Sequence, residues 1–367
     1  MARKLKSDAV LFTTTLLLLV ISMAWVYSAS VVTANEKFHD PAYVVIRQGI
    51  WVAIGLGLLF GLMRLDYRFY RNRTALLWVA GATAVALVAV FFCRPINNAH
   101  RWLGAGGGLG IQPSEFAKLV AIFFVATVLE RRVEEHEPLD PGLIQAGILL
   151  VGLAALIMFE PDYGSAIVLL AAAAVMMFVA GLSYRRVITA LVILPWPLVA
   201  IMLLERYRVQ RWLAFLNPYD DPLGKGFQTI QSLIAVGTGG VWGKGFMAGV
   251  QKMFYLPEAH TDYIFAVIAE ERGLVGAVVV VLCFVVIIWR GLRVARRAPD
   301  AFGALLAVGI TALIGLQAMV NLGVVIGLLP SKGIPLPFVS AGGSSMLASL
   351  AAMGVLLNIS QQASATE

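Results

Sequence analysis

The sequence contains few charged residues and few cysteines. Asp, Glu, Lys and Arg make up 13% of its 367 residues, whereas soluble domains carry about 25%. Hydrophobic residues make up 60%, and the mean hydropathy is +0.84. So few polar groups cannot cover a water-exposed surface, which excludes a soluble enzyme and a disordered chain. The two cysteines are too few for a disulfide scaffold.

Complete nucleotide-binding motifs are also missing. In the glycine cluster at residues 237–249, the phosphate-loop pattern fails at Thr238 and the dinucleotide pattern fails at Trp242. The cluster at residues 104–110 fails similarly, and neither belongs to a strand–loop–helix unit. We therefore do not expect nucleotide binding. Close approach of the glycine backbone to a ligand or to another loop is favoured instead.

Long apolar runs fill most of the sequence. A helix needs about 20 apolar residues to cross a bilayer, and the period-two alternation of transmembrane strands is missing. The runs predict an all-α polytopic membrane protein with ten transmembrane helices, forming a single membrane domain over residues 1–367. They cover residues 9–29, 44–63, 74–93, 114–129, 142–159, 164–182, 187–204, 264–289, 301–329 and 338–359.

The links between these runs predict the orientation, because Lys and Arg in short loops stay on the cytoplasmic side. Basic residues concentrate on one side of the alternating topology, so we expect both termini to be cytoplasmic. The net charge of +7 then reflects topology rather than nucleic-acid binding. The basic segments are residues 1–8, 64–73, 130–140, 183–186 and 290–300.

One connection is long, and in this topology it lies on the outer face. Residues 205–263 join the seventh and eighth spans, and loops of this length are usually functional. Within residues 205–216, Arg208 and Arg211 can share one helical face beside apolar partners. This pattern indicates a helix in the headgroup plane, near lipid phosphates. A plain anchor without substrate contact fits the pattern equally well.

The long loop ends in a cluster of polar groups. Glu258, His260, Thr261 and Asp262 lie together at an outer membrane boundary. Carboxylates are costly there unless they face a polar cavity. An apolar wall would raise the pKa of such a carboxyl group, which suits a general base. A solvated loop end with one capping Asp is the alternative.

Other polar groups can join the same cavity. Arg101 precedes the fourth span and Asp162 lies between the fifth and sixth. Glu115 and Lys118 can meet on one helix face, either as a mutual ion pair or as part of a substrate cavity. Asn321, inside the ninth span, is expected to make a helix–helix hydrogen bond. Further substrate contacts are expected from Gln231, Lys244, Ser340 and Ser344.

These groups suit an anionic, lipid-linked substrate at the external leaflet. Both a transferase acting on that lipid and a transporter moving it across the membrane fit the composition. Transporters often contain internal repeats and binding sites at the membrane midplane. The sequence shows no convincing repeat, and its polar residues gather toward the outer face. Both observations favour the enzyme.

Seven stretches, in order and at family spacing, resemble the SEDS family (shape, elongation, division and sporulation). Its members are polytopic bacterial proteins that polymerise peptidoglycan from lipid II. Gln251–Tyr255 and Leu356–Ser360 favour the division branch, FtsW, over the elongation branch, RodA, which usually has Arg at the position of Ala259. The seven stretches are Val26–Ser30, Arg101–Gly104, Gln112–Lys118, Glu160–Gly164, Gln228–Ala235, Leu256–Asp262 and Pro335–Phe338.

The resemblance implies a peptidoglycan glycosyltransferase that makes β-1,4 links with inversion. Asp262 would be the catalytic base for the acceptor's 4-hydroxyl, with undecaprenyl diphosphate as the leaving group. Glu115 and Lys118 would line the central cavity. Basic residues, or a divalent cation such as Mg²⁺ or Mn²⁺, would offset the charge of the leaving group. We expect no other cofactor and no protein-built metal site.

The resemblance also implies partners and a location. The partners would be a class B penicillin-binding protein, which is the cross-linking transpeptidase, and other divisome membrane proteins. The location would be the bacterial cytoplasmic membrane, at the septum for the division branch. A RodA-like elongation polymerase and a lipid II flippase are the alternatives. Ala341 departs from the family, which usually has Tyr there, so we expect no aromatic contact at that position.

Overall fold

A computed structural model describes residues 7–93, 95, 100–104, 110–135, 141–182, 185, 215–224, 226–331 and 333–363. Over these residues the regular structure is helical, apart from one isolated β-bridge between Leu103 and Ile111. The α-helices are α1 (Ala9–Phe38), α2 (Tyr43–Arg64), α3 (Arg73–Ala89), α4 (Pro113–Glu135), α5 (Pro141–Phe159), α6 (Tyr163–Val179), α10 (Phe227–Gly239), α11 (Ile264–Arg297), α12 (Ala301–Val325) and α13 (Gly343–Ala363). Short 3₁₀ helices are η1 (Tyr67–Arg71), η2 (Val90–Phe92) and η3 (Pro218–Asp220).

The apolar runs coincide with helices throughout the described residues. Six helices there are long and apolar enough to cross a membrane: α1, α2, α3 continued by η2, α11, α12 and α13. Helix α6 and the apolar part of α5 are shorter. The chain is therefore a polytopic, all-helical membrane protein. The predicted span at 187–204, Arg208 and Arg211 lie outside the described residues.

Three helices are longer than their apolar runs predict, and one of them is α4, which continues past residue 129 to Glu135. Helix α1 continues past residue 29 to Phe38 and ends where His39 takes a left-handed conformation (φ 54°). Helix α11 continues past residue 289 to Arg297. Hydropathy marks the part of a helix that matches the bilayer. Polar turns at either end can extend the helix beyond it, so these boundaries were predicted too short.

Two other helices are shorter than predicted, because the chain between them is irregular. Helix α12 stops at Val325 instead of residue 329, and α13 starts at Gly343 instead of residue 338. Before α13 the chain turns, and Ser340 Oγ accepts a hydrogen bond from the Leu336 N–H at 2.8 Å. The backbone groups of this turn are thus satisfied inside the protein, as membrane depth requires.

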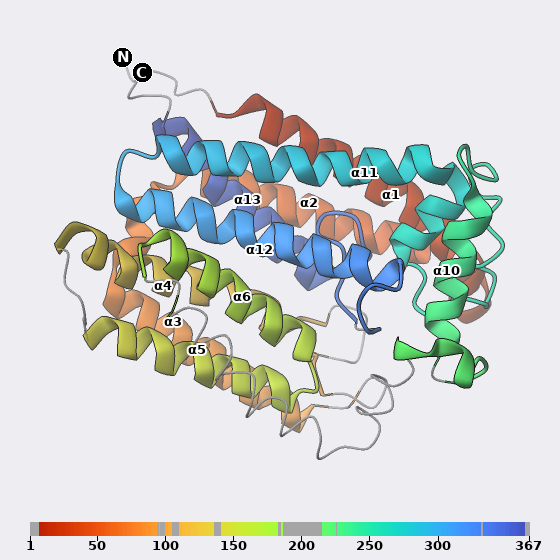
Figure 1. The fold of residues 1–367 in the computed structure, drawn as a ribbon, viewed down its shortest axis with the longest axis horizontal. Helices are drawn as coiled ribbons and strands as arrows, with labels where there is room; N and C mark the ends of the chain where they lie inside the picture. The colour runs from red at the N-terminus through yellow and green to blue at the C-terminus, as the bar shows by residue number, and fades with distance from the viewer. Residues whose placement is uncertain are drawn as a thin grey trace.

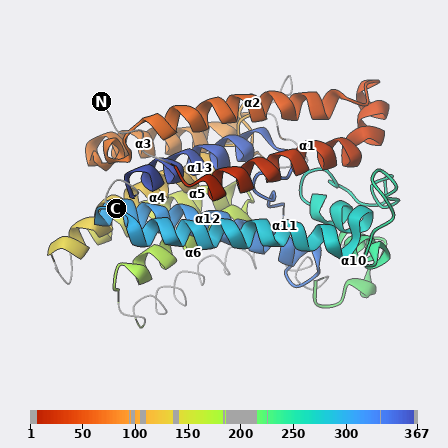
Figure 2. The ribbon, with the colours of Figure 1, turned by 90° about the horizontal axis from the view of Figure 1, so that it is seen from above.

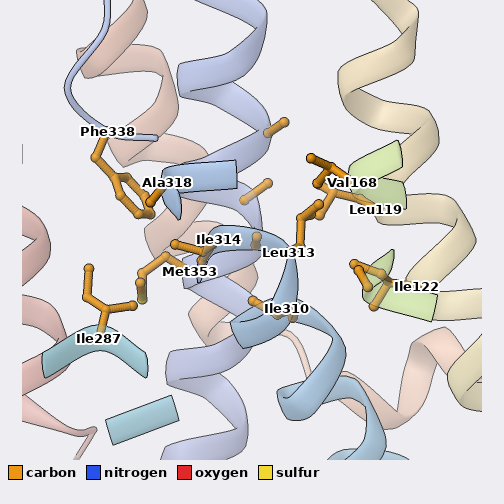
Figure 3. Packing of buried hydrophobic residues seen from close by; sticks show 14 of the residues in the cluster. Leu119, Ile122, Val168, Ile287, Ile310, Leu313, Ile314, Ala318, Phe338 and Met353 are labelled. Carbon is orange, nitrogen blue, oxygen red and sulfur yellow. The ribbon is translucent and has the colours of Figure 1, made fainter. Parts of the chain in front are cut away.

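Helix α12 lies between two groups of helices (Figure 1). In Figure 3, Leu313 points toward Leu119 and Val168, on α4 and α6. On the other side, Ile314 lies near Met353 of α13. All five side chains are buried. Because lipid tails are as apolar as these side chains, close packing stabilises this arrangement more than exclusion from water.

The two described chain ends meet at one end of the bundle. The Asp8 N–H donates to Ser360 Oγ at 3.0 Å, and Arg290 Nε donates to Asp8 Oδ2 at 2.8 Å. Helix α10 lies across the opposite end, against the start of α11 (Figure 2). The segment that contains Asp262 enters α11 at that same opposite end. The bundle therefore separates its basic end from the predicted catalytic end.

Helix α11 is interrupted at Gly273 (φ 64°, ψ −158°), and residues 240–245 fill the interruption. Gly239 and Gly243 approach the α11 backbone so closely that a Cβ on either would collide with the carbonyl of Ala269 or Glu271. The glycine cluster thus makes a close backbone approach, but its partner is the broken helix α11 rather than the ligand or loop that the sequence predicted. The exchanged N–H to C=O hydrogen bonds, over 2.8–3.2 Å, are Lys244 to Glu270, Gly245 to Glu271, Leu274 to Gly240 and Val275 to Val241.

Two buried carboxylates hold this loop by their side chains. Glu271 pairs with Lys252 at 2.6 Å, and Ser28 Oγ of α1 donates to the same oxygen at 2.6 Å. Glu270 pairs with Lys244 at 2.7 Å. Glu270 and Glu271 are each 0% exposed. Such carboxylates are tolerated only when paired, so the loop and α11 stabilise each other.

Replacing Gly243 with Ala tests the interlock between this loop and α11. Gly243 has φ +80° and no room for a Cβ, so Gly243→Ala is expected to cost at least about 1–3 kcal/mol. Thermal unfolding of the purified protein in detergent measures the change. Gly237→Ala is the matched control, because nothing lies within 4 Å of a Cβ there. A Gly243→Ala variant as stable as Gly237→Ala would contradict the interlock.

Candidate active site

Asp262 lies in a series of turns just before α11, and its backbone is fixed on both sides. Its N–H donates to the Glu258 carbonyl at 3.1 Å. Its own carbonyl accepts from Asn321 Nδ2 at 2.8 Å, and Asn321 Nδ2 also donates to the Ile334 carbonyl at 2.7 Å. The prediction that Asn321 makes a helix–helix hydrogen bond was wrong, because both acceptors of its Nδ2 lie outside the helices. From inside α12, Asn321 instead ties two irregular segments together.

The carboxyl group of Asp262 packs beside glycine. A Cβ built on Gly333 would lie 2.8 Å from Asp262 Oδ2, tighter than real Cβ contacts. The same turns are held at another point, where the Ala341 N–H donates to the His260 carbonyl at 3.0 Å. The proline-rich link between α12 and α13 therefore forms one wall against the Asp262 carboxylate, and Gly333 makes the close approach possible.

The surroundings of Asp262 favour its protonated form. Burial raises its pKa from the ordinary value of 3.8 to about 7. The negative charges of Glu258 and Asp162 act in the same direction, whereas the Arg101 guanidinium opposes them. A carboxyl group with a pKa near neutrality holds a proton strongly enough to accept one from a hydroxyl during a reaction.

Arg101 is fixed beside this group by backbone carbonyls. Its Nε donates to the Glu160 carbonyl at 2.9 Å and its Nη2 to the Pro161 carbonyl at 2.5 Å. Asp162, next in the chain, caps α6 by accepting from the Ser165 N–H at 3.2 Å. It also accepts from Gln112 Nε2 at 3.1 Å. The link between α5 and α6 thus brings Arg101 and Asp162 into the electrostatic surroundings of Asp262.

Glu160 lies in one of the seven family-like stretches but was not predicted as a substrate contact. It is 0% exposed, and neither carboxyl oxygen has a hydrogen-bond partner in the described part of the chain. Burial raises its pKa to about 8; Asp162 adds to this shift and Arg101 opposes it. The signal was present, since a carboxylate followed by Pro-Asp links two apolar runs. It was hidden because a carboxylate at a helix end usually reaches water.

His260 and Glu258 lie on the accessible side of the same turns. Glu258 is exposed and accepts from Thr261 Oγ1 at 3.1 Å. Burial lowers the pKa of His260; Glu258 opposes this shift and Lys37 adds to it. The structure thus brings together five of the predicted residues, from three separate parts of the sequence: Arg101, Asp162, Glu258, His260 and Asp262.

Several other predicted residues have structural contacts. Glu115 and Lys118 form a mutual ion pair of 2.7 Å in α4, with side chains 3% and 1% exposed. Ser340 is bound to the Leu336 N–H. Ser344 Oγ accepts from the Gln112 N–H at 2.8 Å. These residues hold helices and turns in place around the site.

Gln231 and Lys244, two further predicted substrate contacts, both lie in the predicted long loop at residues 205–263. Gln231 lies half-buried on α10. Lys244 is committed to Glu270 in the interlock with α11. Within the described ranges, no three His, Cys, Asp or Glu side chains are grouped as metal ligands.

Fold and site together define a class: a polytopic helical membrane protein with a half-buried carboxylate, Asp262, in a hydrogen-bonded turn at one end of its bundle. The chain belongs to the FTSW_RODA_SPOVE family of cell cycle proteins, whose model matches residues 8–365. It is 42% identical over 360 residues to stage V sporulation protein E of Bacillus subtilis, covering 98% of each chain. It is 41% identical over 361 residues to the probable peptidoglycan glycosyltransferase FtsW of Geobacter metallireducens, covering 98% of this chain and 96% of that one.

Solved structures share the fold over nearly the whole chain. One comes from work on the coordination of polymerization and crosslinking by a peptidoglycan synthase complex. It has a TM-score of 0.78 and 29% identity, and covers 98% of this chain and 99% of that one. The rod shape determining protein RodA of Thermus thermophilus has a TM-score of 0.70 and 27% identity, and covers 97% of each chain. The membership in the SEDS family that the sequence motifs predicted is confirmed.

The raised pKa of Asp262 predicts a pH dependence of stability. Because the folded pKa of about 7 lies above the ordinary 3.8, the folded protein binds this proton more tightly than the unfolded chain. The resulting stabilisation is complete below about pH 4 and is lost as the pH rises to about 7. Asp262→Asn removes this contribution while keeping the side-chain shape.

Thermal unfolding of both proteins between about pH 4 and pH 8 measures the difference. Stability should fall less steeply with pH in Asp262→Asn than in the unmodified protein. Other groups, Glu160 included, titrate in both proteins, so the difference between the two curves reports Asp262. Parallel curves would show that Asp262 titrates with an ordinary pKa.

Proposed function

We propose that this protein is a peptidoglycan glycosyltransferase that polymerises lipid II into β-1,4-linked glycan strands. The observation that carries this proposal is Asp262, a carboxylate fixed by Asn321 and packed beside Gly333, whose pKa is raised to about 7. The names of the relatives support the chemistry, since FtsW proteins at 41% and 40% identity are described as probable peptidoglycan glycosyltransferases.

In the proposed reaction, Asp262 accepts the proton of the 4-hydroxyl of an acceptor lipid II. That oxygen attacks C1 of the terminal sugar of the growing strand, and the new C–O bond forms as the bond from C1 to the diphosphate breaks. Undecaprenyl diphosphate leaves with the electron pair, and the configuration at C1 inverts. Asp262 then returns its proton to water. Its raised pKa makes it a stronger base than an ordinary carboxylate.

The neighbouring residues take supporting roles in this proposal. Arg101, Asp162, Glu258 and His260 lie in the electrostatic surroundings of the base and contact substrate. Ser340, Ser344 and Lys244 act through the turns that they hold, and Arg208 and Arg211 bind lipid phosphate. Basic side chains offset the charge of the leaving group. Because the described carboxylates do not form a cation site, a divalent cation would arrive with the substrate's diphosphate.

The proposed location follows from the alternation of the helices. The chain ends meet at the end of the bundle that is rich in basic residues, opposite Asp262. We infer that all ten predicted helices cross the membrane, that both termini are cytoplasmic, and that residues 205–263 form an outer-face loop of one domain. Asp262 then acts on the external leaflet of the cytoplasmic membrane, where lipid II presents its sugars.

The proposed setting is cell division. The division-branch motif Gln251–Tyr255 and the FtsW relatives support this branch. Similarity to a chain from a peptidoglycan synthase complex that coordinates polymerization and crosslinking supports assembly with a cross-linking partner. We propose a class B penicillin-binding protein in that position, with the assembly at the septum.

Asp262→Asn is expected to lower the rate of glycan polymerisation from labelled lipid II by at least about 100-fold. For the unmodified protein, the rate should rise with pH through about 7, because the base must lose its proton before it acts. Gel analysis of the glycan products measures both effects, with Glu36→Gln, an exposed carboxylate at the end of α1, as the matched control.

Asp262→Asn activity within tenfold of the unmodified protein would overturn the catalytic assignment. Unfolding at an unchanged temperature would show that the fold is intact. Lipid II translocation in vesicles without polymer formation would favour a transporter over the proposed enzyme.

A further inference from the structure

A cavity lies beside the turns at residues 258–262, on the side of these turns that faces α1 and α2. Its volume is about 320 Å³, within the range of small-molecule sites. The end of α1, the start of α2, residues 258–261 and residues 341–343 line it. It therefore shares Glu258, His260 and Thr261 with the site, whereas Asp262 does not line it.

Two cations line this cavity without a protein partner. Lys37 is exposed and Arg47 is half-buried. Within the described part of the chain, neither makes a hydrogen bond or an ion pair. In contrast, Lys244, Lys252 and Lys118 are all committed to buried carboxylates. Lys37 and Arg47 are therefore available to an anion from outside the protein.

Four aromatic side chains contribute to the walls of the cavity. Phe38 and Tyr43 stack with ring centroids 4.1 Å apart, and Trp51 and Trp102 contribute two further rings. Trp51 is only 7% exposed, and its indole N–H has no hydrogen-bond partner in the described part of the chain. A buried donor without a partner is costly. Aromatic walls with a few polar groups are typical of ligand sites.

The two sides of the catalytic turns differ in charge. Around Asp262 the charged groups are the carboxylates of Glu258 and Asp162 and the guanidinium of Arg101, which is held by backbone carbonyls. Toward the cavity two unpaired cations face one carboxylate, Glu258. An acidic side suits a neutral sugar hydroxyl that gives up a proton. A cationic side suits a diphosphate.

We propose that this cavity binds the diphosphate and first sugar of a polyprenyl diphosphate-linked substrate, separately from the hydroxyl that meets Asp262. Lys37 and Arg47 bind the phosphate oxygens, and the Trp51 N–H donates to the ligand. The aromatic walls pack against the sugar ring. This proposal deepens the proposed function and rests on it, because joining two lipid-linked units requires both to be held at once.

Binding of undecaprenyl diphosphate to the full-length protein in lipid nanodiscs tests the proposal without depending on catalysis. Arg47→Gln and Lys37→Gln are each expected to weaken binding by about tenfold or more, because each removes a charge-assisted contact. Arg64→Gln is the matched control, since Arg64 is an exposed arginine at the opposite end of α2. Arg47→Lys, which keeps the charge, should lose less affinity than Arg47→Gln.

Three outcomes would overturn the proposal. The first is unchanged affinity in Arg47→Gln and Lys37→Gln, with unfolding temperatures like that of the unmodified protein. The second is equal weakening in Arg64→Gln, which would indicate nonspecific attraction of charge. The third is inorganic pyrophosphate binding as tightly as undecaprenyl diphosphate, which would identify a free-anion site. If the expected affinity differences appear but no glycan forms from lipid II, the proposed function fails while the diphosphate site stands.

Discussion

The rest of this structure depends on one constraint: backbone polar groups at membrane depth must find hydrogen-bond partners inside the protein. Where α11 breaks at Gly273, the freed groups bond to residues 240–245. Where the chain is irregular around Asp262, Asn321 supplies the donor for two carbonyls. Irregular backbone is therefore possible at the end of the bundle that holds Asp262 only because other segments complete its hydrogen bonds. The same irregularity places the Asp262 carboxylate in a turn rather than on a helix face.

Buried charged side chains also need partners inside the protein, and leaving one unpaired costs more free energy than leaving a backbone group unpaired. Glu270 and Glu271 are paired and hydrogen-bonded, and they serve the fold. Asp262 and Glu160 have raised pKa values of about 7 and about 8, because burial outweighs the help of Arg101. The buried carboxylates thus divide into two classes according to whether a cation is paired with them. In the proposed mechanism only the class without a paired cation exchanges a proton with substrate, which is the physical reason for proposing Asp262 as the base.

Much of the fold could be predicted from the sequence, because the thickness of the bilayer sets the length of the apolar run that a spanning helix needs. The start of α2 and the alternation of the helices followed from that coupling, whereas the end of α1 at Phe38 did not, since polar turns carry no hydropathy signal. Within the site, Asp262 was found through the density of polar groups before an apolar run. Glu160 and Gly333 were missed because their importance comes from contacts between segments far apart in sequence. The pairing of Lys244, in the loop, with Glu270 of α11 could not be predicted either, because Glu270 is distant in sequence.

The charged groups around residues 258–262 differ between the side of Asp262 and the side of the cavity lined by Lys37 and Arg47. A base and a group of cations cannot share one pocket without loss, since adjacent cations would lower the pKa of the base and weaken it. Among the described residues, Arg101 is the one cation that opposes the raised pKa of Asp262, and its guanidinium is already occupied by two backbone carbonyls. Lys37 instead acts on His260, across the turn. In the proposed mechanism, Lys37 and Arg47 line the cavity whereas Asp262 does not, so that the carboxylate stays basic while positive charge remains available for a departing diphosphate.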